Sequence, residues 1–158
     1  MLSFASTLSR NSEALVVFVT EKYDYKDKNR ILSKDLVQKI DLFIKTLKLK
    51  NKDEEINSID ISDQKKCFII KVKNKYENSY FEEIGGALFT HIKKFKNINS
   101  VDIYADSLNE NKDKIVKFFS EFVFGFNLKS YTFNKYKTLN KEKINKKINF
   151  KIITSHNN

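Results

Sequence analysis

The seven residues Ala14–Thr20, with the sequence ALVVFVT, constrain the fold more than any other stretch of this chain. They form a continuous run rich in β-branched residues, without the polar and apolar alternation of a strand that has one face in water. The run therefore predicts a strand that is buried on both faces.

Strand and helix patterns alternate along the rest of the chain. Strands are predicted at residues 2–8, 14–20, 56–61, 67–72, 101–105 and 148–154, and helices over 33–47, 79–95 and 107–126. This interleaving predicts an α/β fold, a single mixed β-sheet of about six strands flanked by helices and joined by right-handed crossovers. Because the chain has 158 residues and no repeat or domain boundary, we expect residues 1–158 to form a single domain.

Glycines stand at two informative places in the predicted helices. Gly85 and Gly86 lie inside the second helix, where each costs about 1 kcal/mol relative to Ala. Such a pair indicates a close approach to another backbone. Gly125 is expected to end the third helix, which has the strongest apolar pattern of the chain. Its repeating residues are Ile115, Phe118, Phe119, Phe122, Val123 and Phe126.

Polar residues indicate where the three helices begin. Ser33 is a candidate N-cap for the first helix. Ser79 with Glu82 is a candidate capping box for the second helix, and Ser107 with Glu110 is one for the third.

The first twelve residues, MLSFASTLSRNS, allow two interpretations. They contain Ser and Arg but no acid, which are features of an organellar presequence. The interpretation that we favour is a first strand through Leu2, Phe4 and Leu8.

The net charge of +10 suggests an affinity for nucleic acid. However, Arg10 and Arg30 are the only arginines, and Arg is the side chain best suited to bidentate phosphate contacts. Most of the charge is therefore interpreted as solvated surface. The single cysteine, Cys67, excludes an internal disulfide and fits a reducing, cytoplasmic location. No apolar run approaches the roughly 20 residues that span a bilayer, so no membrane partner is expected.

Candidate catalytic residues are few. His91 has no second ligand one turn away, and His156 lies in the C-terminal tail. Cys67 heads an apolar strand and is interpreted as a buried, inert thiol. Paired acids such as Asp102 with Asp106 are interpreted as solvated rather than catalytic. No catalytic residue and no metal ligand is assigned to this chain.

The stretch from Glu121 to Thr138, EFVFGFNLKSYTFNKYKT, mixes aromatic residues with lysines. One interpretation is a nucleic-acid site, with stacking aromatics and phosphate-tracking lysines. Its lysines would be Lys129, Lys135, Lys137, Lys141 and Lys143. The favoured interpretation is a docking segment at a domain or subunit boundary. Its docking residues would be Tyr131, Phe133, Tyr136 and Lys137.

The same stretch resembles the segment that closes the N-terminal domain of the leucyl (cytosol) aminopeptidase family. ALVVFVT resembles the second strand of that domain, CFII from Cys67 the strand before its second helix, and FEEIGGALFTHIKK the Gly-Gly helix itself. One departure concerns the turn after CFII. The family commonly has Gly-Leu-Gly there, whereas this chain has KVKN from Lys71 to Asn74, so we expect that loop to be rebuilt.

The resemblance implies a macro-domain-like N-terminal domain that is followed in the family by a catalytic domain. Members of the family are homohexamers that release N-terminal residues such as Leu from peptides. They use two divalent metal ions, Zn or Mn, held in the catalytic domain by an Asn-Thr-Asp-x-Glu-Gly-Arg block and further Lys, Asp and Glu residues. These elements do not occur in this chain, so the resemblance implies a non-catalytic domain with no cofactor of its own and no activity alone.

Three hypotheses follow for the function. In the leading one, the chain packs against the catalytic domain of the same polypeptide and helps to assemble or regulate a hexamer. In the second, it is a DNA-binding module that uses its lysine-rich surface. In the third, it is an unrelated basic α/β domain whose similarity to the family is coincidental.

Overall fold

Six strands form one mixed sheet in the order β1-β6-β5-β2-β4-β3. They are β1 (Leu2–Ala5), β2 (Ala14–Thr20), β3 (Ile56–Ser62), β4 (Lys65–Val72), β5 (Ser100–Tyr104) and β6 (Asn149–Ile153). β3 runs antiparallel to β4, while the other paired neighbours among the described strands are parallel. The predicted α/β fold with a single mixed sheet of about six strands is confirmed.

The structure is a computed structural model. It describes the backbone of residues 2–27, 29–50, 54–75, 77, 79–108, 112–137 and 148–155, and the same residues' side chains except those of 2, 112 and 132–137. The helices are α1 (Lys34–Leu49), α2 (Tyr80–Ile92) and α3 (Lys112–Lys137), and a short 3-10 helix, η1 (Ala105–Leu108), follows β5. In the described part of the chain, no helix is both long and apolar enough to cross a membrane.

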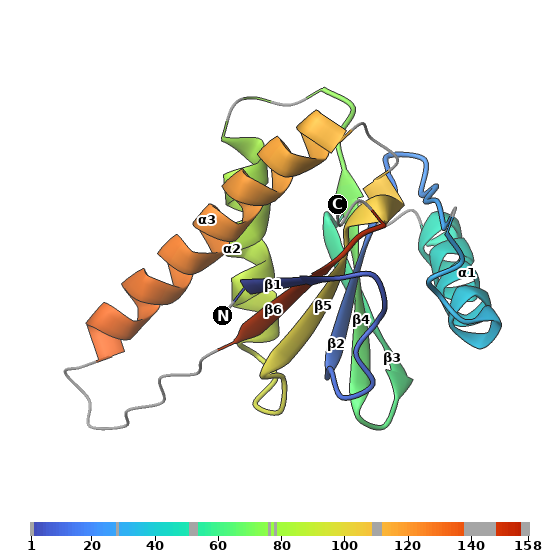
Figure 1. The fold of residues 1–158 in the computed structure, drawn as a ribbon, viewed down its shortest axis with the longest axis horizontal. Coiled ribbons are helices and arrows are strands. Elements are labelled where there is room, and N and C mark those ends of the chain that lie inside the picture. Colours follow the sequence, from blue (N-terminus) through green and yellow to red (C-terminus); the bar gives the residue numbers. More distant parts are fainter. Residues whose placement is uncertain are drawn as a thin grey trace.

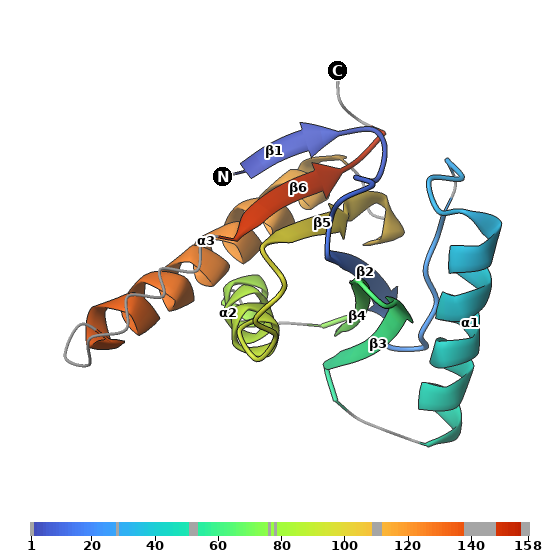
Figure 2. The same cartoon turned by 90° about the horizontal axis from the view of Figure 1, so that it is seen from below.

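β2 lies at the centre of this arrangement and is buried on both faces. Its residues alternate between two cores: Val16 and Phe18 belong to the core under α2 and α3, whereas Leu15, Val17 and Val19 belong to the core under α1. Figure 1 and Figure 2 show α1 on one face of the sheet and α2 with α3 on the other. The prediction from ALVVFVT is therefore confirmed.

Aromatic rings fill the core between the sheet and α3. The ring of Phe18 meets those of Phe118, Phe119 and Phe122 edge-on, at centroid distances of 5.0, 5.8 and 5.7 Å. Edge-to-face pairs at these distances add to the free energy gained from burial alone. This cluster fixes the N-terminal half of α3 on the sheet.

Two glycines allow α2 and α3 to cross with their backbones in contact. A Cβ atom on Gly85 would overlap the carbonyl oxygen of Phe122, and one on Gly125 would overlap the carbonyl oxygen of Glu82. The close approach predicted from the Gly85–Gly86 pair is confirmed at Gly85. The prediction that the third helix ends near Gly125 is wrong, because α3 continues through this residue to Lys137. Gly125 serves the crossing rather than a helix end.

The predicted capping interactions are confirmed only for the first helix. The hydroxyl of Ser33 accepts a hydrogen bond from the amide of Leu36. Ser79 precedes α2, but its hydroxyl donates to the Glu83 carboxylate at 2.7 Å and makes no bond that caps the helix. The predicted capping box of Ser79 with Glu82 is therefore wrong.

The second predicted capping box is also wrong. Ser107 is buried in η1, where its hydroxyl accepts from the amide of Phe18 at 2.9 Å and donates to the carbonyl of Tyr104 at 2.6 Å. Its proposed partner Glu110 lies outside the described residues. Ser107 thus ties η1 to β2 instead of starting α3.

The N-terminal strand is shorter than predicted, since it spans Leu2–Ala5 and leaves Leu8 in the following loop. That loop is anchored on β5 by the buried carboxylate of Asp102. Asp102 accepts hydrogen bonds from the Ser9 amide at 2.7 Å and from the hydroxyls of Ser9 and Ser12, both at 2.9 Å. A buried carboxylate needs such partners, so Asp102 holds this loop against β5.

The glycine crossing yields a stability prediction with an internal control. Gly85→Ala and Gly125→Ala should each destabilise the domain by about 1–3 kcal/mol, because the added methyl group forces two backbones apart. Gly86→Ala should stabilise it by up to about 1 kcal/mol through helix propensity, since its Cβ would lie 3.6 Å from the nearest atoms. Urea unfolding of the three variants measures these differences. Equal effects at Gly85 and Gly86 would contradict a backbone contact confined to Gly85 and Gly125.

Candidate functional site

The stretch that the sequence marks for docking is the C-terminal half of α3. Tyr131 lies on this helix with 68% of its surface exposed. The backbone of Phe133, Tyr136 and Lys137 continues the same helix, but their side chains lie outside the described residues. Figure 1 and Figure 2 show that this end of α3 extends past the sheet.

Two further apolar side chains share the exposed side of α3 with Tyr131. Phe124 is 57% exposed and Leu128 is 47% exposed. The spacing of the three residues, i, i+4 and i+7, places them on one face of a helix. We call Phe124, Leu128 and Tyr131 the α3 stripe. Phe124 and Leu128 were not predicted as docking residues, although their helical spacing relative to Tyr131 is a signal that identifies them.

A shallow groove runs beside the α3 stripe, between α2 and α3. Its volume is about 470 Å³, and Leu128 belongs to both features. Three of its lining residues, Gly86, Ala87 and Gly125, are small and lie where the backbones of the two helices approach each other. Its lining residues are Glu82, Glu83, Gly86, Ala87, Thr90, Gly125, Leu128 and Lys129.

The lysines proposed for nucleic-acid contact are only partly described. Lys129 is exposed and lines the groove, where Glu82 and Glu83 are its neighbours. Lys135 and Lys137 lie in α3 without described side chains, and Lys141 and Lys143 lie outside the described residues. The carboxylates beside Lys129 oppose the approach of a phosphate backbone.

The residues weighed for chemistry are dispersed through the molecule. Cys67 is fully buried in β4, and this burial raises the pKa of its thiol to about 12. His91 is half-buried near the end of α2, where desolvation and then the nearby Lys94 lower the pKa of its imidazole. His156 lies outside the described residues. Among the side chains that are described, no three of His, Cys, Asp or Glu are grouped to hold a metal ion.

The acids Asp102 and Asp106 have structural partners rather than solvent. Asp102 is buried, as described above, so the interpretation of this residue as solvated is wrong. Asp106 accepts hydrogen bonds from the Thr154 hydroxyl at 2.7 Å and from the Ser155 amide at 2.9 Å. Burial raises the pKa of Asp106, but these hydrogen bonds outweigh it and hold that pKa below its usual value. The two acids thus fasten neighbouring segments to β5 and η1.

The sheet order, the two helical layers and the mixed strand directions define a macro-domain-like α/β domain. Two macrodomains of DarG share this fold: that of Thermus aquaticus at 13% identity and a TM-score of 0.64, and that of Mycobacterium tuberculosis at 14% and 0.65. The match covers 98% of this chain in both cases, and 98% and 99% of the respective macrodomains.

The sequence assigns the chain to one family with this fold. The model of the cytosol aminopeptidase family, N-terminal domain, matches residues 16–140, and the chain belongs to this family. A structure of a tomato leucine aminopeptidase mutant agrees in fold, with 12% identity and a TM-score of 0.68. The match covers 97% of this chain but 32% of the tomato enzyme. A search of curated proteins finds no match. The hypothesis of an unrelated domain is therefore wrong.

Cys67 should be chemically silent in the folded protein. Raising its pKa from 9.0 to about 12 lowers the thiolate fraction at neutral pH roughly a thousandfold. We expect iodoacetamide to leave the native chain unmodified and to alkylate it in guanidinium, as followed by mass spectrometry. Ser120→Cys, which places a second thiol at an exposed position of α3, is the positive control. Native alkylation of Cys67 at the rate of this control would contradict its burial.

Proposed function

We propose that this chain is the non-catalytic N-terminal domain of a metal-dependent leucyl aminopeptidase. In this proposal it packs against the catalytic domain of the same polypeptide through the α3 stripe and contributes to the assembly or regulation of a homohexamer. The observation that carries the proposal is the α3 stripe itself, three large apolar side chains side by side on an exposed helix face.

The energetics of the α3 stripe favour a covered state. Full burial of a large apolar side chain is worth about 1.5–3 kcal/mol, and the stripe leaves Phe124 and Tyr131 mostly exposed and Leu128 about half exposed. Aromatic residues are enriched at protein–protein interfaces, where Tyr can bury its ring and keep its hydroxyl at the polar rim. A docked partner would also cover the groove beside Leu128, so the contact area extends from α3 onto α2.

The size of the related enzyme supports a partner within the same polypeptide. The chain spans 32% of the tomato leucine aminopeptidase that it matches. In the proposal, the remainder of such a polypeptide supplies the catalytic domain, the two divalent metal ions, Zn or Mn, and the hydrolysis that releases N-terminal residues from peptides. The described residues of this chain offer no grouped metal ligands, so no catalytic step is assigned to them. The proposed location is cytoplasmic.

DNA binding is the competing function, because the net charge of +10 is compatible with it. Of the five lysines proposed for DNA contact, Lys129 is the one whose side chain the structure describes. The groove that Lys129 lines is also lined by the acidic residues Glu82 and Glu83. This neighbourhood favours docking of a protein surface over docking of a polyanion.

The proposal predicts that the α3 stripe is needed for assembly but not for folding. The triple variant Phe124→Ser, Leu128→Ser, Tyr131→Ser should keep the unfolding midpoint of the isolated chain close to that of the parent, because exposed substitutions have small effects. It should fail to associate with the catalytic region encoded downstream, as measured by co-purification and size-exclusion chromatography. Leu42→Ser with Leu49→Ser, exposed apolar residues on α1, is the matched control and should associate normally.

Three outcomes would contradict the proposal. The first is hydrolysis of a leucine chromogenic substrate by the purified chain alone with Mn or Zn. The second is the absence of any downstream coding sequence for a metal-ligand block. The third is a gel shift with DNA whose log affinity falls linearly with log salt and is lost on charge reversal of Lys135, Lys137 and Lys141.

A further inference from the structure

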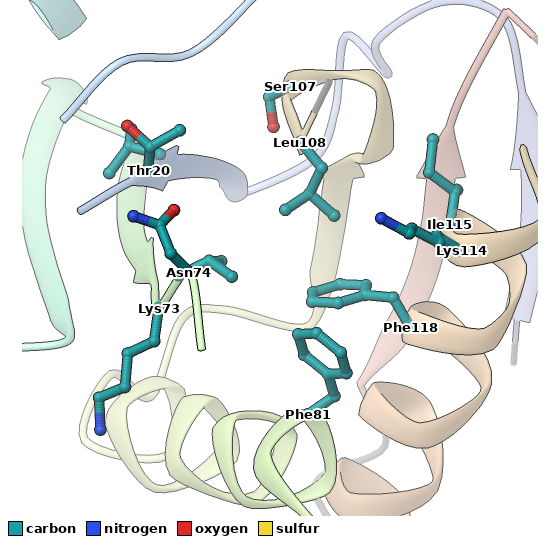
Figure 3. Close-up of a pocket in the computed structure, with 11 residues that line it drawn as sticks. Thr20, Lys73, Asn74, Phe81, Ser107, Leu108, Lys114, Ile115 and Phe118 are labelled. Carbon is teal, nitrogen blue, oxygen red and sulfur yellow. The ribbon is translucent and has the colours of Figure 1, made fainter. Parts of the chain in front are cut away.

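A cavity of about 160 Å³ lies at the C-terminal ends of β2 and β4, and Figure 3 shows aromatic rings from α2 and α3 on one of its sides. Several polar side chains around this cavity are used by the protein itself. The ammonium group of Lys73 pairs with the carboxylate of Glu55 at 2.9 Å, and the side-chain amide of Asn74 donates to Glu21 at 2.7 Å. The hydroxyl of Ser107 both accepts and donates a hydrogen bond within the protein, as described above. We therefore assign no ligand to this cavity.

A second hollow lies on the α1 side of the sheet, between the loop after β2 and helix α1, and its volume is about 360 Å³. Sites for small molecules commonly have volumes of about 300–1,000 Å³, so one small molecule fits in this hollow. We call it the α1 hollow, and its lining residues are Tyr23, Asp24, Tyr25, Asp41, Ile44, Lys45 and Lys48.

The floor of the α1 hollow is apolar and preformed. Tyr23, Tyr25 and Ile44 belong to the core under α1. The backbone of Tyr23 has a φ angle of 62°, which is uncommon for a bulky residue and persists only where the surroundings impose it. Here the amide of Tyr23 donates to the carbonyl of Thr20 at 2.8 Å, and the amide of Thr20 donates to the carbonyl of Asp24 at 2.9 Å. Because the loop is fixed in this way, a ligand does not have to order it.

Two carboxylates and two ammonium groups surround this floor. Lys48 and Asp24 pair with each other at 3.8 Å. The hydroxyl of Tyr25 donates to Asp41 Oδ1 at 2.9 Å, which orients this carboxylate and leaves Oδ2 for another donor. In the part of the chain that the structure describes, the ammonium group of Lys45 has no hydrogen-bond or ion-pair partner. One carboxylate oxygen and one ammonium group thus remain for a ligand.

The spacing of these two groups selects for a ligand that carries both charges. Asp41 and Lys45 are four residues apart on α1, so their Cβ atoms are about 5–6 Å apart on one face of the helix. An α-amino acid has its ammonium and its carboxylate group on the same carbon, and it can therefore face both side chains at once. A simple cation would be repelled by Lys45 and a simple anion by Asp41.

We propose that the α1 hollow binds a free α-amino acid with an apolar side chain. The ammonium group of this ligand pairs with Asp41, its carboxylate pairs with Lys45, and its side chain lies on the ring of Tyr25 and on Ile44. This binding function goes beyond the proposed docking role and does not depend on it, since α1 and α3 cover opposite faces of the sheet.

The test is a titration of the isotope-labelled full chain with L-leucine, followed by amide chemical shifts. We expect saturable shifts centred on Asp24, Asp41 and Lys45. Two analogues each lack one of the charges: 3-methylbutan-1-amine has no carboxylate, and 4-methylpentanoate has no ammonium group. Each analogue should bind roughly fivefold more weakly than leucine, because one exposed ion pair is lost.

Three variants on α1 connect each charge of the ligand to one side chain. Lys45→Gln should weaken leucine binding roughly fivefold and abolish the preference for leucine over 3-methylbutan-1-amine. Asp41→Asn should weaken it by a similar factor and abolish the preference over 4-methylpentanoate. Lys34→Gln, the same change as at Lys45 but at an exposed position outside the hollow, should leave binding unchanged.

All three substitutions alter exposed side chains, and thermal unfolding checks that each variant is folded. The proposal is overturned if leucine gives no saturable shifts at the α1 hollow, or if either analogue binds as tightly as leucine. It is also overturned if Lys34→Gln weakens binding as much as Lys45→Gln does, because the effect would then come from the overall charge.

Discussion

Helices α2 and α3 cross with their backbones in contact at Gly85 and Gly125, and the layout of one whole face of the sheet depends on this crossing. Two helices with ordinary side chains at the contact lie 8–10 Å apart, whereas here a Cβ at either glycine would overlap the opposite carbonyl group. The close crossing draws α3 inward, so that Phe118 and Phe122 reach the ring of Phe18 on the central strand. The loss of helix propensity at the glycines is thus offset by an aromatic core that only a close crossing can form.

The same crossing divides α3 into two parts with different surroundings. N-terminal to it, the helix lies against the sheet and contributes Lys114 and Phe118 to the cavity at the strand ends. C-terminal to it, the helix extends past the sheet and presents Leu128 and Tyr131 to solvent. The cavity and the α3 stripe therefore lie on one helix, on opposite sides of the crossing.

The sequence predicted the strands and the order of the elements well, because β-branched runs such as ALVVFVT and regular helical spacing are local signals. The close backbone contact was predicted correctly at Gly85, whereas Gly125 was wrongly predicted to end the third helix. A glycine after an apolar helical run indicates a helix end and a close contact equally well. Ser107 was misread for a related reason: a serine after a strand looks like an N-cap, and only the fold brings the amide of Phe18 to its hydroxyl. The cavity could not be predicted, because only the fold brings together Thr20 at the end of β2, Asn74 after β4, Leu108 in η1 and Lys114 in α3.

The α3 stripe was missed because α3 is apolar on more than one side. A helix of a single-domain protein normally shows one apolar face and one polar face, and the residues Phe118, Phe122 and Phe126 already account for the face that packs on the sheet. Phe124 and Leu128, which share the exposed side of α3 with the predicted docking residue Tyr131, then look like irregularities in the pattern of a buried helix. They are better explained as a second apolar face with its own requirement for cover. A helix with two apolar faces in one domain leaves one of these faces uncovered, and this physical requirement, rather than the lysine content of the stretch, is the basis on which we propose a docking role for α3.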